Sequence, residues 1–128
     1  VTQPVAARMP APETAFSGMC LVSMLDDRDL VRGSSSITED YQGVKLHFAS
    51  EKHQLAFRAD PEKYWPMADG HCPVATVRNE KETLGAASTA AVYRGKIVLF
   101  RSIPHRVTFA ENPRHFAESL DRIQTASR

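Results

Sequence analysis

Two cysteine–histidine pairs are the residues of this chain best suited to chemistry, and both pairs have the same spacing. Cys20 precedes His53 by 53 − 20 = 33 residues, and Cys72 precedes His105 by 105 − 72 = 33 residues. Thiolate and imidazole are common ligands of zinc, and they also suit copper. The four residues are therefore a candidate metal site. They form either one shared Cys2His2 centre or two separate pairs.

The equal spacing belongs to a longer internal repeat without gaps. Tyr41-Gln42-Gly43 recurs as Tyr93-Arg94-Gly95, at an offset of 93 − 41 = 52 residues. The same offset relates Gly33 to Gly85, Phe48 to Phe100, Phe57 to Phe109 and Pro61 to Pro113. Repeats of this size bury little apolar surface alone. We therefore expect two copies, residues 18–69 and 70–128, packed as one pseudo-symmetric α+β domain.

Each copy is predicted to contain an antiparallel hairpin followed by a short helix. Val44, Leu46 and Phe48 alternate with polar residues, which is typical of a half-buried strand, and Gly43 suits the preceding tight turn. Ser50 is a good N-cap for a helix over residues 51–58. That helix is expected to place Leu55 on the same face as Phe48.

The second copy is predicted to repeat this order and to add a final helix. Its hairpin lies within residues 90–101, and Ser102 caps a helix with Pro104 in its first turn. Residues 114–126 are expected to form the last helix. The apolar runs that open each copy, 20–24 and 72–77, are predicted to be extended.

Composition gives no support for a nucleic-acid partner or for a membrane-spanning segment. The formal charge of +1 gives no electrostatic argument for nucleic acid, and no apolar run is long enough to span a membrane. Residues 1–17 are rich in Ala, Pro, Thr and Gln and are expected to be a flexible leader. They lack the pattern of a signal peptide. An exported protein, periplasmic or secreted, would look like this after signal removal, and so would a domain cut from a longer chain.

The stretch Phe48-Ala49-Ser50-Glu51-Lys52-His53, followed by Phe57 and Asp60-Pro61-Glu62-Lys63-Tyr64, resembles the YHS domain, which is related to the TRASH family. The second copy resembles it less closely. The resemblance covers roughly residues 18–117. It implies a compact α+β fold and, in cysteine-bearing members, transition-metal binding. The first cysteine of the family's F-C-S motif is Ala49 here and Arg101 in the second copy, and the second cysteine is His53 or His105.

These observations favour a copper- or zinc-binding protein for metal storage, delivery or sensing. Met19 or Met24 would add a soft thioether ligand. The missing F-C-S cysteines leave open a metal-free structural or interaction module. Cys20 and Cys72 also leave open a thiol redox partner, or a disulfide in an oxidising compartment. No enzyme is expected, because no second catalytic group accompanies either cysteine.

Two further residue groups have simpler interpretations. The acidic pairs, Asp26-Asp27 among them, are expected to be solvated loop charges, since no acid–base partner is near in the sequence. Trp65 is expected to be a core contact or a contact between the two copies.

Overall fold

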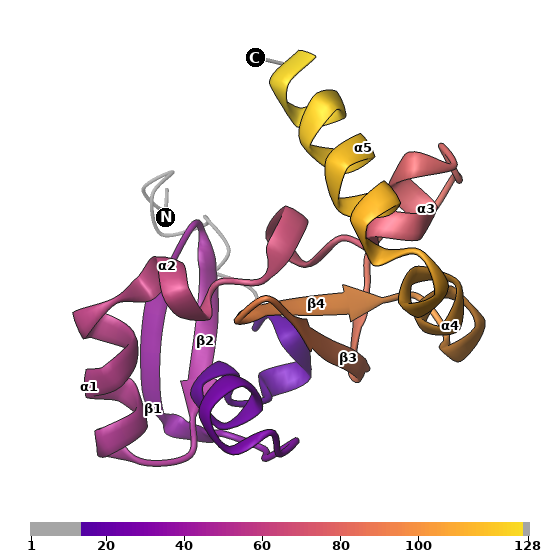
Figure 1. Ribbon diagram of the computed structural model, residues 1–128. Helices are drawn as coiled ribbons and strands as arrows, with labels where there is room; N and C mark the ends of the chain where they lie inside the picture. The colour runs from indigo at the N-terminus through magenta and orange to yellow at the C-terminus, as the bar shows by residue number, and fades with distance from the viewer. Residues whose placement is uncertain (1–13, 127–128) are drawn as a thin grey trace, which may run out of the picture.

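The computed structural model describes residues 14–126, and most of the expected leader lies outside this range. The chain forms a mixed α+β structure with two small antiparallel sheets, as predicted (Figure 1). Its strands are β1 Ser34–Tyr41, β2 Val44–Phe48, β3 Ala86–Tyr93 and β4 Lys96–Phe100. Its helices are α1 Glu51–Ala59, α2 Pro61–Tyr64, α3 Pro73–Val77, α4 Ile103–Glu111 and α5 Pro113–Ala126. Short helical turns are η2 Phe16–Gly18, η3 Ser23–Asp27 and η4 Met67–Gly70.

Both predicted hairpins are confirmed. In the first, Tyr41 pairs with Val44 across the two residues Gln42 and Gly43, whose φ angles are 52° and 79°. In the second, Arg94 and Gly95 take the same left-handed conformation, with φ of 51° and 76°. Two successive positive φ angles are the mark of a two-residue hairpin turn that matches the twist of the strands. Glycine at the second position lowers the cost of that turn.

The predicted helices after each hairpin are also confirmed, together with their caps. The Ser50 hydroxyl accepts a hydrogen bond from the His53 backbone N–H, and the Ser102 hydroxyl accepts one from the N–H of His105. The helices bury Phe57 and Phe109. The expectation that Leu55 shares a face with Phe48 is wrong, because Leu55 is 59% exposed whereas Phe48 is fully buried. The helix turns its Phe57 side to the sheet and leaves Leu55 to the solvent.

The two apolar runs predicted to be extended are helical instead. Residues 21–27 form helical turns that include η3, and residues 73–77 form α3. A short apolar run buried on all sides shows no period that separates helix from strand. In the second run, Pro73 at the first helical position favours the helix, because proline has no N–H to leave unpaired there.

Elements of the first half of the chain, residues 18–69, have counterparts in the second half, residues 70–126. The bounds of β1, β2 and α1 recur 52 residues later as the bounds of β3, β4 and α4. Backbone hydrogen bonds recur as well. Cys20 N–H donates to the Val31 carbonyl, and Cys72 N–H donates to the Thr83 carbonyl. The same offset thus relates bonded pairs of atoms as well as residue types.

The two halves meet through different elements. Cys20, Leu21, Met24 and Leu25 of the first half share one apolar cluster with Ala87, Ile97 and Leu99 of the second. Val98 and Phe100 belong to another cluster, which also holds Cys72, Val74, Phe109 and Phe116. Alternate residues of β4 therefore enter two cores, since successive side chains of a strand point to opposite faces. Trp65 is buried in the first cluster, as expected of a core residue.

Within the described range 14–126, no helix combines the length and the apolar character needed to cross a membrane.

Replacing Gly33 or Gly85 with alanine should destabilise the fold, because each glycine lies against the neighbouring strand. A Cβ at Gly33 would lie 2.4 Å from the His47 carbonyl carbon, and one at Gly85 would lie 2.6 Å from the Leu99 Cβ. We expect each change to lower the free energy of unfolding by about 1–3 kcal/mol in urea denaturation. Ser88→Ala, at an exposed position, is the control and should change it by less than about 0.5 kcal/mol. Unchanged stability in both glycine variants would contradict the close approach.

Candidate functional site

Both predicted cysteine ligands are core residues. Cys20 and Cys72 are each 0% exposed, and both thiols are free. Each follows a glycine-containing left-handed turn and donates its backbone N–H across a loop, at 2.8 Å for Cys20 and 2.6 Å for Cys72. The two cysteines lie in different apolar clusters. A buried thiol in apolar surroundings packs as a small hydrophobic side chain.

His53 lies at the start of α1, with both ring nitrogens against other side chains. Its Nδ1 is 2.6 Å from the Ser50 hydroxyl, and its Nε2 is 3.4 Å from a carboxylate oxygen of Asp27. The Ser50 oxygen already accepts the His53 backbone N–H. One assignment of protons satisfies all three contacts: the Ser50 hydroxyl donates to Nδ1, and the Nε2–H points to Asp27.

His105 repeats this arrangement at the start of α4. Its Nδ1 is 2.5 Å from the Ser102 hydroxyl, and its Nε2 is 3.0 Å from a carboxylate oxygen of Glu80. The acidic partner is not at the corresponding position, since 27 + 52 = 79 is an asparagine. A carboxylate one residue further along makes the same contact. The two halves therefore contain the same serine–histidine–carboxylate arrangement, with the carboxylate at non-equivalent positions.

The serine–histidine–carboxylate sets hold the helix starts in place. Ser50 and Ser102 accept a peptide N–H as N-caps. The histidine then links each cap to an acidic residue of another segment, Asp27 or Glu80. We assign the sets a structural role.

The predicted metal ligands are not gathered into a cluster. Among the described residues, no group of three or more His, Cys, Asp or Glu side chains is arranged to hold a metal ion. His53 and His105 each face one carboxylate, while the cysteines lie inside the two apolar clusters. Each imidazole thus has one carboxylate and one serine hydroxyl beside it, and neither buried thiol belongs to a group of three such ligands among the described residues.

Asp26 and Asp27 have partners that no pattern in the sequence indicates. The Tyr64 hydroxyl donates to Asp26 at 2.7 Å, and Lys63 lies 3.9 Å from the same carboxylate. Asp27 and His53 line a hollow of about 350 Å³ together with Lys52. The partners are 26–38 residues away in the chain, and no local pattern signals such contacts. The prediction of solvated loop charges missed these partners, although Asp26 and Asp27 are themselves exposed.

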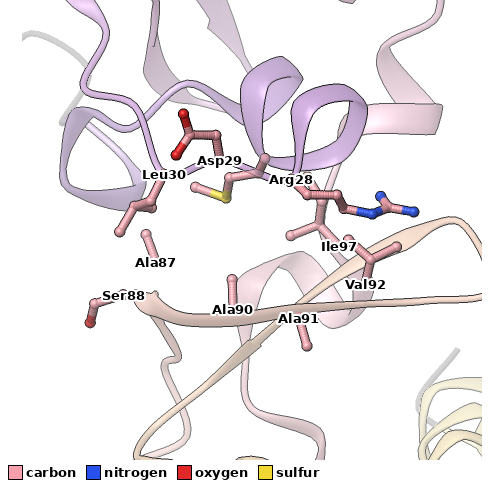
Figure 2. Close-up of a pocket in the computed structure, with 10 residues that line it drawn as sticks. Arg28, Asp29, Leu30, Ala87, Ser88, Ala90, Ala91, Val92 and Ile97 are labelled. Atoms are coloured by element: carbon pink, nitrogen blue, oxygen red, sulfur yellow. The ribbon is translucent and has the colours of Figure 1, made fainter.

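A second hollow, of about 230 Å³, lies where the two halves meet (Figure 2). Figure 2 shows Arg28, Asp29 and Leu30 on one side and residues of β3 on the other. Its apolar lining consists of Met24, Leu30, Ala87, Ala90, Ala91, Val92 and Ile97. The hollow is the incompletely filled edge of the contact between η3 and the second sheet.

Comparison of the chain with protein-family models, with curated protein sequences and with solved structures gave no match in any of the three. The assignment of a role to these residues therefore depends on their geometry.

Loss of the cap serines should weaken both halves by similar amounts. Ser50→Ala and Ser102→Ala each remove an N-cap acceptor and a contact to a histidine ring. We expect each to lower the free energy of unfolding by about 1 kcal/mol in urea denaturation. Ser50→Asp and Ser102→Asp keep a cap acceptor and should retain most of the stability. If the alanine variants are as stable as the parent, the structural role of the sets is wrong.

The raised pKa of Tyr64 should make the free energy of unfolding fall at high pH. Burial, followed by the hydrogen bond to Asp26 and the nearby charges of Asp26 and Asp60, raises the pKa of Tyr64 from 10.0 to about 12. The folded state therefore resists ionisation that the unfolded chain allows. The contribution of Tyr64 to the free energy of unfolding is complete below pH 10 and is lost as the pH rises towards 12.

A phenolate absorbance titration measures this effect directly. Of the three tyrosines, one should titrate late in the folded chain, and Tyr64→Phe should remove that late step. Tyr41→Phe is the control and should leave the late step in place. A parent chain whose three tyrosines titrate together would contradict the burial of an Asp26-bonded hydroxyl.

Proposed function

We propose that the chain is a metal-free structural or interaction module of the YHS-like type, made of two related units, residues 18–69 and 70–128. The observation that supports this best is the use of the four candidate ligands within the protein. Both cysteines are fully buried, and both histidines have a hydrogen-bonding group within 3.4 Å of each ring nitrogen. These residues already serve packing and helix capping.

Repetition of the histidine contacts strengthens the proposal. In both halves an N-cap serine lies against Nδ1 and a carboxylate against Nε2. The carboxylates come from non-equivalent positions, Asp27 and Glu80. Two different solutions to the same contact favour a structural requirement at the start of each helix. On this proposal the hydrogen bonds of the histidines join segments that a bound metal would join in cysteine-bearing YHS domains.

Copper or zinc binding through Cys20, His53, Cys72 and His105 is the competing proposal. It requires both thiols, which are fully buried, to become accessible to a metal that also contacts the imidazoles. Thiol redox chemistry between Cys20 and Cys72 requires the two clusters to open as well, because both thiols are buried in them. Each alternative therefore needs a rearrangement that the metal-free module does not.

Elemental analysis of protein purified without chelator or affinity metal tests the proposal. Copper(I) and zinc are offered under reducing conditions, excess metal is removed by dialysis, and free thiols are counted in the same sample. We expect no stoichiometric metal and two free thiols. His53→Gln and His105→Gln should each lower the free energy of unfolding by about 1 kcal/mol without changing the metal content. Each removes the contacts of an imidazole with the cap serine and with the carboxylate.

The other outcomes identify the alternatives. One equivalent of metal, lost on either Cys20→Ala or Cys72→Ala, would establish a shared centre. Two equivalents, each lost only with changes in its own half, would establish separate sites. A mass lower by two hydrogens in the non-reduced chain would reveal a Cys20–Cys72 disulfide. Any of these results would overturn the metal-free assignment or its reduced state.

A further inference from the structure

The contact between the two halves has a distinct socket and a distinct plug. The socket is the helical segment of residues 21–25, where Leu21, Met24 and Leu25 are buried. The plug is the outer face of the β3–β4 sheet, which presents Ala87, Ile97 and Leu99 to the same cluster. An interface that uses a different surface on each side is heterologous, and such interfaces can in principle be extended by further copies.

The second half has its own socket, and α5 covers it. The counterpart of residues 21–25 is α3, since 73 − 21 = 52, and its Val74 and Ala75 are buried. In Figure 1, α5 lies alongside α3, and the two helices are in contact. α2 and α5 begin at corresponding residues, Pro61 and Pro113, but α2 ends at Tyr64, whereas α5 continues to Ala126. The additional turns bury Leu120, and α5 packs against α3, the counterpart of the segment that receives a sheet in the first half.

The first half has its own plug face, and that face is polar. The positions that correspond to Ala87, Ile97 and Leu99 hold Ser35, Lys45 and His47. Lys45 is paired with Asp40 at 3.4 Å, and Ser35 is exposed. Burying an ammonium group and an imidazole against an apolar socket would be unfavourable without partners. This sheet is therefore unsuited to a socket of the α3 type.

We propose that the chain is a head-to-tail stack of two units closed at both ends, and that the α3 socket fits the sheet of another YHS-like unit. The partner is a two-stranded sheet whose outer face is aliphatic in the pattern of Ala87, Ile97 and Leu99. α5 occupies this socket within the chain, as the end caps of repeat proteins do. The proposal rests on the two-unit assignment made under Proposed function.

Two variants, each opened at one end, test the proposal when they are mixed. The socket variant ends at Ala117, so its last helix keeps Phe116 and stops near the point that corresponds to the end of α2. The plug variant is the full chain with Ser35→Ala, Lys45→Ile and His47→Leu, which copies the aliphatic face. Sedimentation velocity and native mass spectrometry, with chelator present, measure the species in each sample. The chelator separates this result from the outcome of the metal analysis.

We expect each variant to be monomeric alone and the mixture to form a 1:1 complex that is absent from the parent chain. A control plug variant, Ser35→Ala, Lys45→Gln and His47→Gln, keeps the face polar and should form no complex. If truncation prevents folding, Leu120→Asp in the full chain displaces α5 and serves as the socket variant. Two folded variants that do not associate would overturn the proposal. Self-association of the socket variant that is independent of the plug variant would overturn it too.

Discussion

β4 is buried on both faces, and the rest of the structure depends on that single strand. Ile97, Val98, Leu99 and Phe100 are all fully buried, two facing one cluster and two facing the other. The corresponding strand β2 has only one such face, because Lys45 and His47 alternate with Leu46 and Phe48. The difference between a continuous apolar run and an alternating one separates a central element from an outer one. Related strands therefore play different roles in the two halves.

The role of the cysteines and histidines follows from how these cores are closed. Each cysteine lies beneath a loop that its backbone N–H holds in place, and its thiol fills the core. Each histidine lies at the edge of its core, between a helix start and an acidic residue from an earlier segment. An imidazole with two hydrogen-bonding nitrogens can join two segments without a metal. Residue types associated with metal sites can thus be used for packing and hydrogen bonding alone.

The sequence predicted the features that depend on neighbouring residues. Turn glycines after Gln42 and Arg94, the caps Ser50 and Ser102, and the strand alternation before Phe48 are local signals, and the structure agrees with each. The helical form of residues 21–25 could not be predicted, since a fully buried short run has no distinguishing period. The contacts of Asp26 and Asp27 could not be predicted either, because their partners follow 26 or more residues later. The continuous apolar run of β4 is visible in the sequence, but which segments cover its two faces is a property of the assembled fold.

The shared strand also limits how this chain can change over time. Halves of about 50 residues bury little apolar surface alone. Here the first half lacks part of its core without Ile97 and Leu99, and the second half would expose those side chains if it were alone. Neither half can be deleted or exchanged without leaving a hydrophobic surface uncovered. A substitution in β4 therefore meets the packing of both cores at once.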